Sequence, residues 1–412
     1  MSILVVEDAH VTDLQPIVLA RPAYAITCGG YRLIDWLRRL QQPICGIVRP
    51  HLHEIQLEDH HVLAPAELPA EGFTLVVSAR LVPSVAAYHR LRGLAEQHQT
   101  RVLWQDGQFV AALVPRERAA AIVNHPQELS NTDTAIAHLP AVNCELPLFR
   151  YPHDVVRHNM ETLRENLEFR VAEGEYREIQ DGVFAAPGVQ LGPHCVTVTR
   201  SGPIVLESGA VMGPFCYLNG PALVGQGAKL IEHASIKDGV SIGHTTKIGG
   251  EVEASVIEPY TNKQHHGFLG HSYLGSWINL GAGTCNSDLK NTYGKVNMDY
   301  AGQRVATGMQ FVGCMMGDYS KTAINTGIFT GKTVGVCSML YGFVTANVPS
   351  FVNYARLFGQ VTELPPEVMI ATQERMFRRR NVAQRPCDIQ LVHDMYELTR
   401  EERQLAGEPL AL

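Results

Sequence analysis

A six-residue apolar period in the middle of the chain limits what the sequence can fold into. From Leu206, every sixth residue is large and apolar: Leu206, Met212, Leu218, Val224, Leu230, Ile236, Ile242 and Ile248. Four positions after each of the first seven stands a small or slender residue: Ala210, Cys216, Ala222, Ala228, Ala234, Val240 and Thr246. An α-helix repeats about every 3.6 residues and a strand about every 2, so neither explains this period. A chain wound as a triangular prism, with one short strand per face, does explain it.

The period returns twice further along the chain. It recurs at Phe268, Leu274 and Leu280, and then at Met316, Thr322, Ile328, Val334 and Leu340. We expect the two interruptions, residues 251–267 and 285–310, to leave the prism as loops. Loops on a rigid scaffold commonly carry function.

The pattern divides the chain into four parts. Residues 1–150 alternate short apolar runs with helical patterns and predict an α/β domain with a mostly parallel sheet. Residues 151–178 predict a helical linker, and residues 179–350 predict the parallel β-helix. Residues 351–412 predict a helical tail that caps the prism or contacts another copy.

Composition narrows the class of protein. The net charge of −7 argues against nucleic acid as a partner, although Arg378–Arg380 is a short basic run. The nine cysteines include no Cys-x-x-Cys pair, which indicates free thiols in a reducing compartment, and we expect a cytoplasmic protein. We recognise no signal peptide and no membrane span in the sequence.

One glycine-rich stretch carries a family resemblance. It reads Gly270-His271-Ser272-Tyr273-Leu274-Gly275, then Asn279-Leu280-Gly281-Ala282-Gly283-Thr284 and Cys285-Asn286. It resembles the motif Gly-His-x-x-Tyr-Leu-Gly, Asn-Ile-Gly-Ala-Gly-Thr, Cys-Asn of hexapeptide-repeat acyltransferases. More closely, the chain resembles the bifunctional GlmU-like family of N-acetylglucosamine-1-phosphate uridylyltransferases / glucosamine-1-phosphate acetyltransferases. One residue is missing here between the histidine and the tyrosine.

The resemblance implies a fold and an assembly. It implies a Rossmann-like nucleotidyltransferase-like domain followed by a left-handed parallel β-helix. It also implies a homotrimer whose active sites lie between neighbouring prisms, with acetyl-CoA as co-substrate.

His271 is the predicted general base, as the resemblance implies. A neutral amine must lose a proton as it attacks a thioester, and histidine can accept a proton near neutral pH. The alternative is a turn residue that only makes backbone hydrogen bonds. His265 and His266 are alternative bases, and together they are a weaker candidate for a metal site, because no third ligand stands at suitable spacing.

The resemblance also implies substrate contacts. Lys263 and Lys290 are predicted to hold a sugar phosphate, because a flexible ammonium pairs well with phosphate. Tyr273, Asn279 and Asn286 are predicted to bind the sugar. The alternative for the two lysines is a solvated loop position, which is common for lysine.

A third set of residues corresponds to the acyl-CoA strip of the family. Gly313 and Cys314 are predicted to lie along the pantetheine arm, and Lys321 and Lys332 to contact the CoA phosphates. Cys285 and Cys314 are more simply explained as packing residues.

The N-terminal domain departs from the nucleotidyltransferase pattern. No glycine-rich loop follows the first apolar run, and Pro22 is followed by Ala23 where the family has lysine. Arg21 and Asp8 are the candidate residues for a divergent site, with Asp8 as a candidate ligand of Mg²⁺. The alternative is a domain that keeps the fold without transferring a nucleotide.

These observations lead to a predicted function and a rival. The prediction is an acyl-CoA-dependent N-acyltransferase acting on an amino sugar, either a sugar phosphate or a nucleotide sugar, with a divergent nucleotidyltransferase domain. The rival is a non-catalytic β-helix protein that binds a nucleotide sugar or serves as a scaffold.

Overall fold

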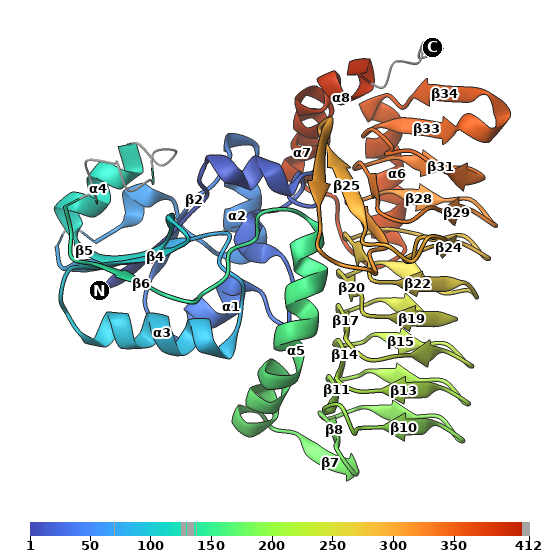
Figure 1. The fold of residues 1–412 in the computed structure, drawn as a ribbon, viewed down its shortest axis with the longest axis horizontal. Coiled ribbons are helices and arrows are strands. Elements are labelled where there is room, and N and C mark those ends of the chain that lie inside the picture. The colour runs from blue at the N-terminus through green and yellow to red at the C-terminus, as the bar shows by residue number, and fades with distance from the viewer. Residues whose placement is uncertain (70, 125–128, 130–135, 137, 406–412) are drawn as a thin grey trace. The chain divides into compact units, whose positions relative to one another are not determined.

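The computed structural model describes residues 1–69, 71–124, 129, 136 and 138–405 (Figure 1). The chain forms two compact units. The first comprises Met1–Leu14, Arg21–Thr27 and Tyr31–Tyr151. The second comprises Gln15–Ala20, Cys28–Gly30 and Pro152–Leu412. The division agrees with the predicted boundary near residue 150, except that two short N-terminal segments belong to the second unit.

The first unit is built on a six-stranded sheet in the order β2-β1-β3-β5-β4-β6. Its strands are β1 (Ser2–Val6), β2 (Ile44–Ile47), β3 (Phe73–Ser78), β4 (Arg101–Gln105), β5 (Gln108–Pro115) and β6 (Ala141–Asn143). β1 pairs in parallel with β2 and β3, but β5 runs antiparallel to both β3 and β4. β4 pairs in parallel with β6, so β5 alone runs against the other five strands of this sheet. The sheet is therefore mixed but mostly parallel, as predicted, and β4 and β5 form a hairpin at Asp106–Gly107.

Helices connect these strands. They are α1 (Leu33–Arg38), α2 (His53–His60), α3 (Val85–Glu96) and α4 (Arg116–Asn124). The helices expected over residues 31–40 and 85–98 correspond to α1 and α3. The Ser84 side chain caps α3 by accepting a hydrogen bond from the Ala87 amide at 3.1 Å.

The second unit contains a three-sided parallel β-solenoid, which confirms the predicted β-helix. Face 1 carries β8 (Val183–Ala185), β11 (Ile204–Leu206), β14 (Ala222–Val224), β17 (Val240–Ile242), β20 (Val256–Ile257), β23 (Tyr273–Leu274), β27 (Cys314–Met316) and β30 (Lys332–Val334). β7 (Arg177–Gln180) pairs antiparallel with β8 at the start of this face.

The other two faces follow the same order along the prism. Face 2 carries β9 (Gln190–Leu191), β12 (Val211–Met212), β15 (Lys229–Leu230), β18 (Lys247–Ile248), β21 (Asn262–Lys263), β28 (Lys321–Thr322), β31 (Met339–Leu340), β33 (Val352–Ala355) and β34 (Gln360–Glu363). Face 3 carries β10 (Val196–Val198), β13 (Tyr217–Asn219), β16 (Ser235–Ile236), β19 (Glu251–Glu253), β22 (Phe268–Gly270), β24 (Cys285–Asn286), β29 (Gly327–Ile328) and β32 (Phe343–Val344).

The six-residue period is the core of this prism. Leu206, Val224 and Ile242 are register partners in adjacent strands of face 1, so every third apolar residue of the period returns to the same face. All eight residues of the first run are buried in one apolar cluster. Phe268 is a correction: the neighbouring Leu269 enters the core, and Phe268 is partly exposed.

The two interruptions behave differently. Residues 251–267 stay in the solenoid as coils containing β19, β20 and β21, so the expected loop is absent there. These coils are shorter than the regular ones, which shifts the apolar period. Residues 285–310 do leave the prism, in an excursion that contains the antiparallel hairpin β25 (Asn297–Tyr300) and β26 (Gln303–Ala306).

The predicted linker helix is α5 (His153–Glu173), which packs on the solenoid (Figure 1). Leu163 and Leu167 of α5 form a buried cluster with Val205 and Leu223 of face 1. Asn159 is fully buried, and its Nδ2 donates to the Gly239 carbonyl at 2.8 Å. Face 1 is therefore partly covered by the chain itself.

The C-terminal tail consists of α6 (Pro366–Arg378), α7 (Pro386–Leu398) and α8 (Arg400–Leu405). The tail contacts the last coils, where Glu402 accepts a hydrogen bond from the Ser350 amide at 3.0 Å. The Phe377 ring of α6 lies against Trp277, with ring centroids 4.4 Å apart. Among the residues that the structure describes, no helix has the length and apolar character needed to cross a membrane.

Candidate active site

His271 lies at the corner where the chain turns from face 3 to face 1. Its φ of +45° places it in the left-handed region, which a non-glycine residue occupies only when its surroundings hold it there. The His271 amide donates to the Glu253 carbonyl at 3.1 Å, and its carbonyl accepts from the Gly313 amide at 2.8 Å. Both neighbouring coils therefore fix this corner.

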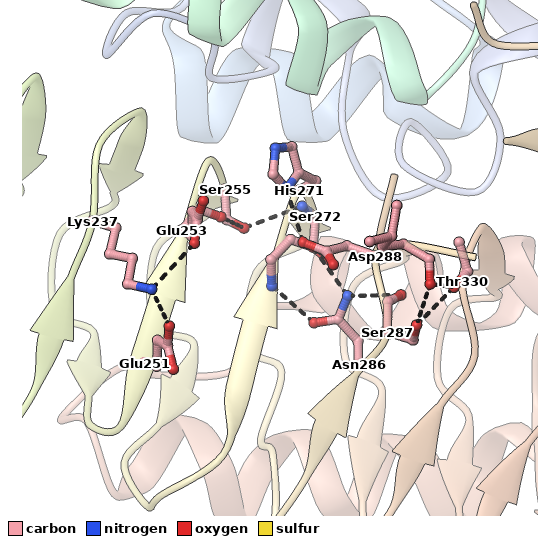
Figure 2. Close-up of polar contacts among 12 residues, drawn as sticks. Lys237, Glu251, Glu253, Ser255, His271, Ser272, Asn286, Ser287, Asp288 and Thr330 are labelled. Carbon is pink, nitrogen blue, oxygen red and sulfur yellow. Dashed lines mark hydrogen bonds and ion pairs between the residues drawn. The ribbon is translucent and has the colours of Figure 1, made fainter. Parts of the chain in front are cut away.

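The His271 ring is oriented by a carboxylate. Its Nδ1 lies 2.9 Å from Asp288 Oδ2, and its ring stacks on Phe311 with centroids 5.2 Å apart (Figure 2). An ionised carboxylate only accepts hydrogen bonds, so it favours the tautomer with the proton on Nδ1. The lone pair of Nε2 is then available. The side chains of His271 and Asp288 are 16% and 13% exposed, so the pair is shielded but reachable.

Asn286, Ser272 and Gly313 support this corner. The Asn286 side chain accepts from the Gly270 amide at 2.9 Å and donates to the Gly270 carbonyl at 3.0 Å. The Ser272 hydroxyl donates to the same carbonyl at 2.7 Å. A Cβ on Gly313 would lie 2.0 Å from the Gly270 carbonyl oxygen, so only glycine fits there. Asn286 and Gly313, predicted as ligand contacts, thus lie beside His271 in structural positions.

Three of the predicted sugar and phosphate contacts lie elsewhere on the prism or on its excursion. Tyr273 is fully buried in face 1, and its hydroxyl donates to Glu258 at 2.8 Å. Asn279 is exposed on face 2. Lys290 is partly exposed on the excursion, two residues after Asp288. One chain therefore does not bring Tyr273 and Asn279 to the His271 corner.

Lys263 is a correction to the predicted phosphate contacts. It occupies the inward position of face 2 between Ile248 and Leu280 and is 2% exposed. Its Nζ donates to the carbonyls of Gly249 at 2.7 Å and Gly267 at 2.6 Å. Burial lowers its pKa to about 8. Because the buried Lys263 ammonium donates its hydrogen bonds to backbone carbonyls, it is not placed to contact a ligand.

The predicted CoA contacts also differ in accessibility. Burial lowers the pKa of Lys321 to about 8, and its Nζ donates to the Tyr319 carbonyl at 2.8 Å. Lys332, on face 1, is partly exposed. Cys314 is buried with its pKa raised to about 11, which agrees with a packing role. Lys321 and Lys332 are both partly exposed, and the Lys321 ammonium is already engaged by a backbone carbonyl.

His265 and His266 lie at the corner between faces 2 and 3, and both are exposed. Within the described part of the chain, neither side chain has a hydrogen-bond partner in the structure. The segment His265-His266-Gly267-Phe268-Leu269-Gly270 keeps the family's spacing from histidine to an aromatic-Leu-Gly sequence, with phenylalanine in place of tyrosine. Spacing therefore favours His265 as the base, whereas the ordered carboxylate partner favours His271.

In the first unit, each of the two acidic residues that follow β1 forms an ion pair with an arginine. Glu7 Oε2 accepts from Arg49 Nε at 3.0 Å, and Glu7 Oε1 accepts from the Ala23 amide at 2.8 Å. Asp8 forms a two-point ion pair with Arg80, with Nε to Oδ1 at 2.9 Å and Nη2 to Oδ2 at 2.8 Å. Arg80 is 1% exposed, so this pair belongs to the folded interior.

This arrangement does not fit the predicted magnesium site at Asp8. Both oxygens already face a buried guanidinium, and a metal ion would have to displace it. Across the described ranges of the chain, no group of three or more His, Cys, Asp or Glu side chains is arranged to hold a metal. Arg21, the other candidate, is buried. Burial lowers the pKa of His60 to about 3, and the charges of Arg32 and Arg21 lower it further in the same direction.

Asp288 is the main residue that sequence reasoning missed. It stands in Cys285-Asn286-Ser287-Asp288, directly after the recognised motif. An acidic residue at the start of an excursion has no distinctive spacing to a histidine in the preceding coil. Only the return of the chain brings the two side chains together.

Comparisons with known proteins agree with the resemblance. Residues 3–174 match a family model described as "Sugar nucleotidyl transferase". The bifunctional GlmU proteins of Ralstonia pickettii and Cupriavidus pinatubonensis are 35% and 31% identical over 29% and 28% of this chain. A bifunctional sugar-1-phosphate nucleotidylyltransferase/acetyltransferase of Sulfurisphaera tokodaii is 30% identical over 24% of the chain. Each match spans 26% of the relative's own length.

These matches confirm the predicted similarity to GlmU-like proteins. The family model and the Sulfurisphaera relative are both described as transferases, in agreement with the predicted enzyme class. Among solved structures, the UDP-N-acetylglucosamine acyltransferase of Francisella novicida is similar with a TM-score of 0.35 and 16% identity. That similarity covers 57% of this chain and 79% of the other.

Proposed function

We propose that the protein is an acyl-CoA-dependent N-acyltransferase that acts on an amino sugar bearing a phosphate or a nucleotide. The observation that carries the proposal is the hydrogen bond from His271 Nδ1 to Asp288 Oδ2 at 2.9 Å. It leaves the opposite ring nitrogen available as a base in a shielded corner. The similarity to a bifunctional sugar-1-phosphate nucleotidylyltransferase/acetyltransferase supports the choice of a phosphorylated sugar and an acetyl group.

The chemical step follows from this geometry. The neutral amine attacks the thioester carbonyl carbon, a C–N bond forms, and His271 Nε2 accepts the proton that the nitrogen loses. The tetrahedral intermediate then collapses, the C–S bond breaks, and the CoA thiolate leaves and takes up a proton. Asp288 stabilises the imidazolium that exists between these events.

We propose that the site is completed by a second copy of the chain. His271 lies at the corner between faces 3 and 1, Asn279 on face 2 and Lys332 on face 1. A single chain therefore does not collect these three residues around one ligand. A cyclic trimer would place a corner of one prism against a face of the next. The helix α5 packs on face 1 and does not cover faces 2 and 3. Lys290 remains the candidate phosphate anchor closest in sequence to Asp288.

We propose that the first unit keeps the sugar nucleotidyltransferase fold without transferring a nucleotide. The support is the pairing of Glu7 with Arg49 and of Asp8 with Arg80, which leaves neither carboxylate for a metal. Such a unit would bind a nucleotide sugar or support the assembly. The cytoplasmic location stays a prediction.

The test is acetyl transfer followed by mass spectrometry of the product, since the exposed Cys285 thiol would interfere with thiol-release reagents. With glucosamine 1-phosphate, UDP-glucosamine and glucosamine as acceptors, His271→Gln is expected to lower kcat by about 10³-fold or more. His194→Gln, at another corner of the solenoid, is the matched control and is expected to keep full activity.

Two further variants separate the candidate bases. His265→Gln and His266→Gln are expected to retain most activity if His271 is the base. Loss of activity in His265→Gln alone would keep the function and transfer the base to the corner between faces 2 and 3. If no acceptor is acetylated by the wild-type chain, the non-catalytic binding role replaces the proposal.

A further inference from the structure

A cluster of four cations lies on face 2 of the solenoid, and we call it the face 2 cation cluster. It consists of Lys229, Lys247, Arg379 and Arg380. Lys229 and Lys247 are register partners in β15 and β18 and alternate with the inward Leu230 and Ile248, so both point outward. Arg379 and Arg380 directly follow α6, and Arg380 Nη2 donates to Asn262 Oδ1 at 2.5 Å. Because Asn262 is the register partner of Lys247, the end of α6 meets these rungs.

These four cations have no carboxylate partner. Within the described residues, none of them lies within 4.0 Å of an Asp or Glu oxygen. Lys237 on face 3 is a contrast, because it pairs with both Glu251 and Glu253 (Figure 2). On α6 itself, Arg378 pairs with Glu374 at 2.5 Å. The solenoid therefore pairs nearby cations with acids but leaves this cluster uncompensated.

The cations of the cluster repel one another. After burial, the charges of Arg380, Lys229 and Arg379 lower the pKa of Lys247. Burial and then Arg379 lower the pKa of Arg380. Like charges held together are unfavourable for folding, and an anion bound between them would remove that cost.

We propose that the face 2 cation cluster is a binding site for the phosphate groups of a small molecule, with Lys247 and Arg380 as its central contacts. Arg380 offers a planar set of N–H donors, and Lys229 and Lys247 offer ammonium groups from neighbouring strands, whose backbones lie about 5 Å apart. That spacing suits two linked phosphates. A net charge of −7 for the chain and the small extent of the cluster favour a small molecule over a polynucleotide.

The site is separate from the His271 corner of the same chain. In a three-sided prism, face 2 lies opposite the corner between faces 3 and 1. A ligand held by the cluster would therefore reach a base on another copy of the chain, or a base at the corner between faces 2 and 3 of the same chain. The inference rests on the proposed function only for the source of the phosphate, which is the CoA portion or the sugar substrate.

The test is isothermal titration of the full chain, without turnover, using pyrophosphate, adenosine 3′,5′-bisphosphate, UDP-N-acetylglucosamine and glucosamine 1-phosphate. Lys247→Gln/Arg380→Gln is expected to weaken pyrophosphate binding by about tenfold or more. Lys229→Gln, a substitution at an exposed position, is expected to weaken it less while leaving the fold intact. Lys237→Gln is the matched control and is expected to bind like the wild type.

The arms of the titration identify the source. Stronger binding of adenosine 3′,5′-bisphosphate, lost in the double variant, assigns the site to the CoA portion. Stronger binding of the UDP-sugar or the sugar phosphate assigns it to the sugar substrate. Equal affinity of wild type and double variant for every probe would overturn the inference.

The outcome is independent of acyl transfer. Phosphate binding that depends on Lys247 and Arg380 in a chain that acetylates no acceptor would keep this site while the proposed function fails. Acetylation that is unaffected in the double variant, together with absent phosphate binding, would do the reverse.

Discussion

The corner at His271 and the end of β1 in the first unit each hold a carboxylate shielded from solvent, but they use it differently. At the corner, Asp288 engages one nitrogen of the His271 ring and leaves the other for chemistry. At the end of β1, Asp8 and Arg80 engage each other through both carboxylate oxygens. The first arrangement orients a reactive group, and the second closes one off.

The difference shows how a fold can persist while its chemistry changes. A buried guanidinium and the carboxylate that faces it are compatible with folding only as long as both partners remain, because either one alone would be an unpaired buried charge. A histidine with a single carboxylate partner keeps its own proton-accepting site. These pairings are why we propose catalysis at the His271 corner and no nucleotide transfer in the first unit.

The largest expected effect is on the ion pair of the first unit. Arg80→Leu leaves the Asp8 carboxylate buried without its partner and is expected to lower the free energy of unfolding by about 3–5 kcal/mol. Asp8→Asn/Arg80→Leu removes both charges and is expected to restore part of the loss. The measurement is urea unfolding followed by tryptophan fluorescence. A change below about 1 kcal/mol in Arg80→Leu would contradict a structural role for this pair.

The next effect concerns the positioning of His271. Asp288→Asn can donate a hydrogen bond to Nδ1 and so favours the tautomer with the proton on Nε2, where the base should be free. We expect kcat for acetyl transfer to fall by about 10²-fold with KM little changed. Asp288→Glu is the conservative variant and should recover part of the rate. A loss confined to KM would instead make Asp288 a ligand contact.

The smallest effect tests Lys263, a solenoid cation whose ammonium is compensated by backbone carbonyls. The folded pKa of Lys263 is about 8, below its ordinary value of 10.5, so folding costs free energy while the ammonium is charged. Between these two values the unfolded chain binds a proton that the folded chain lacks, and stability rises with pH. Relative to Lys263→Met, the wild type should gain about 2 kcal/mol from pH 7 to pH 10 in denaturant unfolding.

The comparison supplies the control for that experiment. Arg80 is compensated by a carboxylate rather than by backbone carbonyls. The pH course of Arg80→Leu against the wild type from pH 7 to pH 10 is therefore the reference for Lys263→Met. Parallel pH curves for wild type and Lys263→Met would show that Lys263 has an ordinary pKa.

Most of the solenoid could be predicted from the sequence. Residues such as Leu206, Val224 and Ile242 reveal the coil directly, because each coil repeats the same three-sided contacts. The prediction slipped at Phe268, where the neighbouring Leu269 is the inward residue, and at Lys263, where the expected loop stays in the solenoid as a shortened coil. A polar Lys263 in the apolar column has no sequence signature, since its carbonyl acceptors are created by the turns around it.

The candidate site was less predictable than the scaffold. The motif identified His271, with His265 and His266 as alternatives, but it could not tell which has a carboxylate partner. Tyr273 was expected at the sugar and is instead buried against Glu258. Its neighbour Leu274 is the inward residue, so Tyr273 is buried by chain that packs on the outside of face 1. A motif read along the chain does not contain that information.

The amino-acid sequence by itself determined the three-sided solenoid, the α/β unit before it and the similarity to GlmU-like proteins, because periodic apolar residues and local motifs are encoded along the chain. Only the tertiary structure decided that Asp288 orients His271 and that Arg80 forms an ion pair with Asp8. It also decided that Lys247 and Arg380 lie near each other with no carboxylate partner among the described residues. Each of these pairings joins residues from separate coils or elements. Their energies depend on distance and burial, which exist only once the chain has folded.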